Sequence, residues 1–210
     1  MNFGFLIFPD AEELDFIGPW EMIAMWSKFA NGPENRLIVA ESPDKVICAK
    51  GLSVNPHVTF NTCPALDYLL VPGGQGTRTE VNNTRLIDFV SDQAINCKAV
   101  LSVCTGAFIL HRAGLLYGRR ATTHWNSLQR LRELGDVEVV EERIVRDGII
   151  WTAAGVSAGI DLALAFIAGE TGEEAAAVAQ FSAEYYPAQV CYGDLHKSEQ
   201  APEYLKNHGH

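Results

Sequence analysis

A cysteine stands where a predicted strand meets a predicted helix. The apolar segment 99–103 is typical of a buried strand, Cys104 and Thr105 follow it, and a helix is predicted over 106–113. This order is typical of a nucleophile elbow, a tight turn that presents a side chain above the carboxyl edge of a sheet. Because helix N-termini favour thiolates, we expect a lowered pKa at Cys104, and the Thr105 N–H would be free to stabilise an oxyanion. The alternative interpretation, a buried small residue, is less favoured by the elbow pattern.

Two further segments could contribute chemistry. Asp15 lies among apolar neighbours, which raise a carboxyl pKa and favour a protonated acid near neutral pH. Such an acid could deliver a proton to a substrate, whereas the alternative is an N-cap for a helix that begins near Pro19. The loop at Gly73 and Gly74 matches neither dinucleotide nor P-loop patterns, so it is either a plain turn or a second backbone donor, from Gly74, opposite Thr105.

Other histidines and cysteines give no metal site. His124, in a Thr-Thr-His-Trp setting, is either an accessory base near the thiol or a structural imidazole packed under Trp125. No metal-ligand spacing joins the remaining histidines, His57, His111, His196, His208 and His210. No CxxC pair occurs among the five cysteines, Cys48, Cys63, Cys97, Cys104 and Cys191, and their odd number fits a reducing, cytoplasmic compartment.

The elements that must position these residues alternate along the chain. Strands are predicted over 3–8, 37–40, 46–48, 68–71, 99–103, 137–140, 144–145 and 149–152, and helices over 19–29, 86–95, 106–113, 128–134, 160–168 and 175–181. Pro19 is expected in the first turn of its helix, and Asp147-Gly148 as the hairpin turn between the last two strands. This alternation predicts parallel βαβ units and a sheet that is covered on both faces.

Length and composition predict one domain over 1–196, followed by a frayed polar tail over 197–210. The formal net charge of −10 argues against a nucleic-acid partner. No apolar run reaches the roughly 18 residues that a membrane span needs, so no membrane association is expected.

Several of these segments together resemble the ThiJ/PfpI superfamily over nearly the whole chain. The segments are Leu14-Asp15-Phe16-Ile17-Gly18-Pro19, Val71-Pro72-Gly73-Gly74, Val103-Cys104-Thr105-Gly106, Arg120-Ala121-Thr122-Thr123-His124-Trp125 and Ala154-Gly155-Val156-Ser157-Ala158-Gly159-Ile160-Asp161. The resemblance implies a flavodoxin-like three-layer sandwich with a mostly parallel central sheet and a homodimer as the assembled form.

Within that superfamily, peptidase-like members carry histidine directly after the cysteine, where this chain has Thr105. The Leu-Asp-x-x-Gly-Pro and Val-Cys-Thr-Gly motifs are instead similar to the isonitrile hydratase family. That resemblance implies catalytic roles for Cys104, Asp15 and Thr105, with water added to an isonitrile through a Cys104 thioimidate and with no cofactor. For the resting site we expect a Cys104 thiolate beside a protonated Asp15.

Three other functions fit the same segments. The segments also resemble the sensor domains of AraC-type regulators, so the chain could be a non-catalytic module that binds a small molecule. A low-pKa thiol could equally sense oxidation. Glyoxalase-type aldehyde chemistry is less favoured, because such members usually carry glutamate at the position of Asp15.

Overall fold

A computed structural model describes residues 1–188 and 190–206 of the chain. Its main sheet has seven strands in the order β10-β11-β7-β6-β1-β2-β5, of which only β10 is antiparallel to its neighbour. The bounds are β1 (Asn2–Leu6), β2 (Asn35–Ala40), β5 (Val58–Thr59), β6 (Tyr68–Val71), β7 (Ala99–Val103), β10 (Ile144–Asp147) and β11 (Ile150–Ala153). The run β2-β1-β6-β7-β11 is the 2-1-3-4-5 order of flavodoxin-like folds, so the predicted fold class is confirmed.

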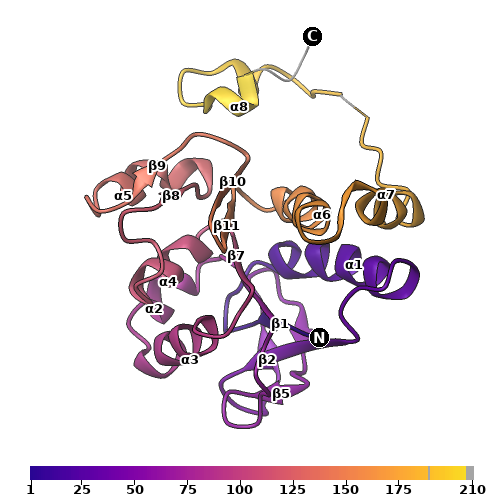
Figure 1. Ribbon diagram of the computed structural model, residues 1–210. Coiled ribbons are helices and arrows are strands. Elements are labelled where there is room, and N and C mark those ends of the chain that lie inside the picture. The colour runs from indigo at the N-terminus through magenta and orange to yellow at the C-terminus, as the bar shows by residue number, and fades with distance from the viewer. Residues whose placement is uncertain (189, 207–210) are drawn as a thin grey trace.

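Helices cover both faces of this sheet, as Figure 1 shows, and complete three layers. One face carries α1 (Glu13–Phe29), α6 (Ala158–Thr171) and α7 (Glu173–Ser182), which pack on one another and on a core that includes Phe3, Phe5 and Trp151. The other carries α2 (Thr77–Glu80), α3 (Thr84–Ala94) and α4 (Gly106–Arg112), over a core that includes Leu69 and Val100. Alternate strand residues enter the two cores because side chains alternate across a strand.

Smaller elements complete the fold. They are the strand pairs β3 (Val46–Ile47) with β4 (Ser53–Val54) and β8 (Arg120–Ala121) with β9 (Glu138–Val139), the short helices α5 (Leu128–Arg132) and α8 (Glu203–Lys206), and the 3-10 turns η1 (Trp125–Ser127) and η2 (Leu195–Lys197).

Three local predictions were wrong. Helix α1 begins at Glu13, not near Pro19, and its acidic first turn suits the helix dipole. Pro19 therefore lies inside the helix, where it removes one backbone donor without ending it. The two-residue turn between β10 and β11 is Gly148-Ile149, because Asp147 already pairs with Ile150. The segment from Ser198 to Lys206 is folded, with Ala201 and Pro202 buried, whereas residues 207–210 of the predicted tail lie outside the described residues.

Candidate active site

Three strand ends bring the predicted site residues to one edge of the sheet. Asp15 follows β1, the Gly73-Gly74 loop follows β6, and Cys104 follows β7. Because these strands are parallel neighbours, their carboxyl ends meet. The strand order reverses between β1 and β6, and in open α/β sheets ligands bind beside such a reversal. We call this edge of the sheet, around Asp15, Gly73 and Cys104, the thiol crevice.

The backbone at Cys104 makes a tight strand-to-helix turn. Its φ of 57° lies in the left-handed region, which is strained for a residue with a side chain. The Cys104 N–H donates to the carbonyls of Ala153 (3.1 Å) and Ala154 (3.0 Å), and its own carbonyl accepts from Thr123 Oγ1 at 2.8 Å. Neighbouring segments therefore hold this conformation in place.

The glycine loop lies directly against that turn. A Cβ atom added to Gly73 would lie 2.4 Å from Thr105 N and 2.8 Å from Cys104 Cβ, distances that leave no room for a side chain. The Gly73 N–H also donates to Asp15 Oδ2 at 2.8 Å. Gly73 thus joins the carboxyl of Asp15 to the cysteine turn.

Asp15 is fully buried and does not cap α1, since it lies inside the first turn. Burial raises the pKa of its carboxyl well above the usual range, against smaller lowering effects that include hydrogen bonds from Gly73 N–H and the Cys104 thiol. Its Oδ1 has no well-formed hydrogen bond among the residues that the structure describes. The environment therefore favours a protonated acid beside the thiol, as expected.

The thiol differs from the prediction. Burial, and after it the charge of Asp15, raises the pKa of Cys104 to about 12, although the N–H groups of Thr105 and Val156 act in the opposite direction. The expected lowered pKa was wrong because Cys104 is only 7% exposed and the seven-residue α4 offsets little of that desolvation. A neutral thiol beside a neutral carboxyl is the favoured resting pair.

Gly74 does not supply the free donor that we expected. Its N–H donates to Thr105 Oγ1 at 3.0 Å, and that hydroxyl lies 3.1 Å from Thr77 Oγ1. The second backbone donor at the sulfur is Val156, whose φ of 46° is also left-handed. Sequence reasoning missed Val156, although its segment follows β11, the next strand along this edge.

His124 supports the Val156 segment. The imidazole is half-buried, its Nδ1 accepts from Asn126 N–H at 3.2 Å, and a Cβ on Gly155 would lie 2.3 Å from its Cδ2. Burial lowers the pKa of His124, so the neutral ring is favoured. No hydrogen bond joins it to Cys104 among the described residues, and its contacts fit a positioning role better than a basic one.

Tyr204, in α8, is a site neighbour that sequence reasoning also missed. Its half-buried ring packs against the core cluster that contains Cys104. Burial raises the pKa of Tyr204, and the charges of Glu141 and then Cys104 add smaller contributions in the same direction. The C-terminal segment therefore packs on the same core cluster as the thiol.

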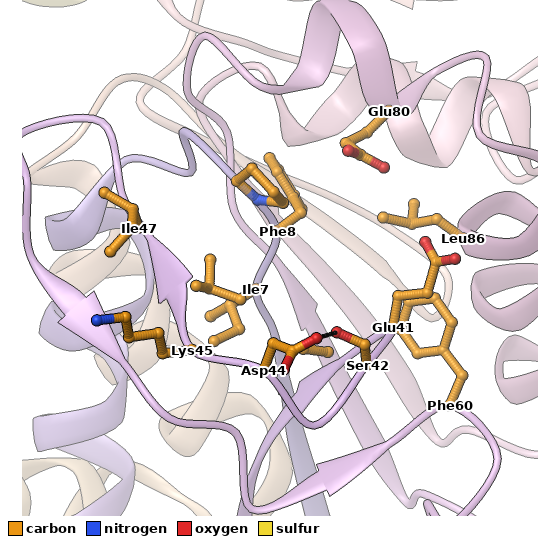
Figure 2. Close-up of a pocket in the computed structure, with 13 residues that line it drawn as sticks. Ile7, Phe8, Glu41, Ser42, Asp44, Lys45, Ile47, Phe60, Glu80 and Leu86 are labelled. Carbon is orange, nitrogen blue, oxygen red and sulfur yellow. Dashed lines mark hydrogen bonds between the residues drawn. The ribbon is translucent and has the colours of Figure 1, made fainter.

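A separate cavity of about 450 Å³, whose lining does not include Cys104, lies at the carboxyl ends of β1 and β2 (Figure 2). Ile7, Phe8 and Leu86 give it apolar walls, and the carboxyls of Glu41 and Glu80 lie at one side. The side-chain amide of Asn83 donates a hydrogen bond to each carboxyl at 2.8 Å.

Residues 1–188 and 190–206 contain no group of three His, Cys, Asp or Glu side chains placed to hold a metal ion. None of their helices combines the length and apolar character needed to cross a membrane.

Known proteins resemble this chain in sequence and in structure. Residues 2–169 match the model of the DJ-1/PfpI family. The chain is 39% identical over 189 residues to isonitrile hydratase of Pseudomonas putida, which covers 90% of this chain and 80% of that protein. A ThiJ/PfpI family protein from Pseudomonas syringae has 34% identity and a TM-score of 0.85, over 98% of this chain and 82% of that one.

A transcriptional regulator is also similar. GbdR of Pseudomonas aeruginosa, a helix-turn-helix regulator, is 31% identical over 134 residues, which cover 63% of this chain and 36% of the regulator. The similarity to the hydratase is therefore higher and extends further along both proteins.

Proposed function

This chain belongs to the DJ-1/PfpI family, and from that premise we propose that it is an enzyme that hydrates isonitriles to N-substituted formamides. The observation that carries the proposal is the Asp15 carboxyl beside the Cys104 thiol, both desolvated, in a chain similar to isonitrile hydratase along most of its length.

The first step adds the thiol across the terminal carbon of the isonitrile. Asp15 gives its proton to that carbon, the Cys104 sulfur forms a bond to the same carbon, and the thiol proton passes to the Asp15 carboxylate. The product is a thioformimidate, in which a double bond joins the carbon to nitrogen, and Asp15 is again protonated. A raised pKa suits this role, because the acid holds its proton until the substrate takes it.

The second step consumes water. Water adds across the C=N bond, its hydroxyl to carbon and its proton to nitrogen, and gives a tetrahedral species. The C–S bond then breaks, the hydroxyl proton returns to sulfur, and the formamide leaves. In this mechanism the N–H groups of Thr105 and Val156, which donate to the sulfur, stabilise charge that develops there. Both steps use only protein groups and water, so the reaction needs no cofactor.

A sensing role is the second candidate, and the similarity to GbdR supports it. In that case the same crevice would bind a small molecule without turnover. Oxidation sensing is less favoured than ligand sensing, because burial raises the pKa of Cys104 and so disfavours the thiolate that an oxidant attacks.

The experiment is turnover of a small panel of alkyl and aryl isonitriles, followed by formamide release. We expect wild-type turnover, and we expect Cys104→Ala to abolish it. The matched control is Cys97→Ala, since Cys97 is also 7% exposed with a pKa raised to about 12, but lies outside the crevice. Its rates should stay within a few-fold of wild type.

Two outcomes would count against the proposal. Full activity in the Cys104→Ala protein would end the covalent mechanism. Absence of turnover across the panel, together with binding of an isonitrile, would favour the sensing role.

A further inference from the structure

Three arginines line one cavity on the side of the molecule that carries α2, α4 and α5. The cavity has a volume of about 290 Å³ and is lined by Arg78, Val81, Phe108, His111, Arg112, Arg130 and Leu134. None of these residues belongs to the thiol crevice. The cavity therefore combines guanidinium groups with an aromatic ring and two aliphatic side chains, and the proposed reaction uses none of them.

Within the part of the chain that the structure describes, these guanidinium groups have no carboxylate partner. Among the described residues no ion pair involves Arg78, Arg112 or Arg130. Arg112 Nε donates only to the carbonyl of Val81, at 3.1 Å, and the nearby carboxyl of Asp136 is paired with His111 at 2.9 Å. The whole chain carries 26 Asp and Glu against 16 Lys and Arg, so unpaired arginines gathered at one cavity contrast with its overall charge.

Two of the arginines, Arg78 and Arg130, influence each other electrostatically. The guanidinium of Arg130 stacks on the ring of Phe108, 3.7 Å from its centroid, and this ring is 5% exposed. Burial, and after it the positive charge of Arg78, lowers the pKa of Arg130. The charge of Arg78 therefore disfavours the charged form of Arg130, and an anion between the two side chains would offset both the repulsion and the lost hydration.

We propose that this cavity binds a small oxyanion carried on an apolar group, such as a phosphate monoester or a carboxylate. Guanidinium groups of Arg78 and Arg130 would hold the oxyanion through paired N–H donors, which match the geometry of both anions. The apolar group would lie against Val81 and Leu134, at the same cavity. The proposal does not depend on isonitrile turnover.

The test measures binding of phenyl phosphate by titration calorimetry, with phenylacetate, inorganic phosphate and benzyl alcohol as comparison ligands. We expect both aryl anions to bind, inorganic phosphate to bind more weakly, and neutral benzyl alcohol not to bind. The ratio of phenyl phosphate to phenylacetate affinity reports which oxyanion the site prefers. Added salt should weaken binding, because the charges are partly exposed.

Single substitutions locate the site. Arg78→Gln and Arg130→Gln should each weaken phenyl phosphate binding about tenfold or more, the scale of one charge-assisted contact. Arg78 is exposed, so its loss tests the site without disturbing the Phe108 packing. The matched control is Arg146→Gln. The guanidinium of Arg146 also lies over an aromatic ring, 4.6 Å from the centroid of Trp151, and forms no ion pair among the described residues, but it is not part of this cavity.

The remaining outcomes separate this cavity from the thiol crevice. Cys104→Ala should bind phenyl phosphate as wild type does, whether or not the enzyme hydrates isonitriles. Wild-type affinity in both arginine variants, or binding lost in Cys104→Ala, would overturn the proposal. The proposal would also be overturned if neither aryl anion bound at concentrations of about 10 mM, at which a complex of this affinity would form.

Discussion

At the scale of single residues, Asp15 and Cys104 share a desolvated corner of the crevice. Each is disfavoured in its charged form by burial, and the charge of Asp15 additionally disfavours the thiolate. A neutral pair can pass protons to and from a neutral substrate without separating charge in a water-poor site. This property suits addition to an isonitrile, which carries no net charge.

The raised pKa of Asp15 predicts a pH-dependent cost to stability. Below the unfolded-state pKa of about 4 the carboxyl is protonated in both states, and its neutral form suits burial. As pH rises from the unfolded-state pKa to the folded-state pKa, the carboxyl ionises in the unfolded state but stays protonated in the folded state. Over this range folding loses stability. Asp15→Asn keeps an acceptor for Gly73 N–H and cannot ionise. It should therefore be more stable than wild type at pH 8, by about 1.4 kcal/mol for each unit of raised pKa.

Urea unfolding of wild type and Asp15→Asn at pH 4 and pH 8 measures this difference. The gain should shrink towards pH 4, and the exposed Asp92→Asn should show no comparable gain. The same Asp15→Asn protein should lose on the order of 10²-fold in isonitrile turnover, because it cannot deliver a proton. Equal stability at both pH values would mean that Asp15 ionises normally.

Much of the site could be predicted from local patterns, and the rest depends on three-dimensional burial. Asp15, Gly73 and Cys104 follow strands that the apolar runs marked, so parallel pairing had to bring them together. The direction of the Val156 N–H depends on a left-handed backbone that no residue type there requires. The sign of the Cys104 pKa shift likewise depends on how completely neighbouring segments exclude water, which no spacing encodes.

At the scale of elements, strand ends and helix starts decide what the crevice presents. Most strands and helices were predicted within a few residues, because their apolar runs are continuous or periodic. The short strands β4, β5 and β8 and the one-turn helix α2 were not predicted. The start of α1 was also wrong, because the proline at its seventh residue suggested a start at Pro19, while the start at Glu13 carries Asp15 into the crevice. The C-terminal segment was missed because its polar composition gives no periodic signal, although Tyr204 packs on the core.

That segment should limit access to the thiol. Because Tyr204 packs against the cluster that contains Cys104, Tyr204→Ala should open the approach and speed alkylation by N-ethylmaleimide several-fold at pH 9. The modified peptide that carries Cys104 can be followed by mass spectrometry, since Cys191 is exposed. Tyr192→Ala is the control, as Tyr192 is 93% exposed on the same C-terminal stretch. Equal rates in the two variants would place the segment away from the approach.

At the scale of the whole molecule, the surface near the crevice combines acid with exposed apolar groups. Leu14 and Ile17 of α1 are 38% and 39% exposed, and Leu52, beside β4, is 42% exposed. Glu13 Oε1 joins these segments by accepting from the N–H groups of Lys50 (2.6 Å) and Leu52 (3.3 Å). Neighbouring exposed apolar groups of this kind are typical of protein interfaces.

We therefore expect a homodimer that uses this surface. Since two chains of net charge −10 repel each other, association requires apolar burial, and a symmetric pair brings the same residues together from both copies. Light scattering should give about 46 kDa, twice the 23.0 kDa of one chain. Ile17→Glu and Leu52→Glu each place a carboxylate in the contact and should shift the protein towards monomer at micromolar concentration. Ile95→Glu, at a 77% exposed site following α3, should remain dimeric. A 23 kDa wild type would refute the dimer, and dimeric Ile17→Glu and Leu52→Glu proteins would place its interface elsewhere.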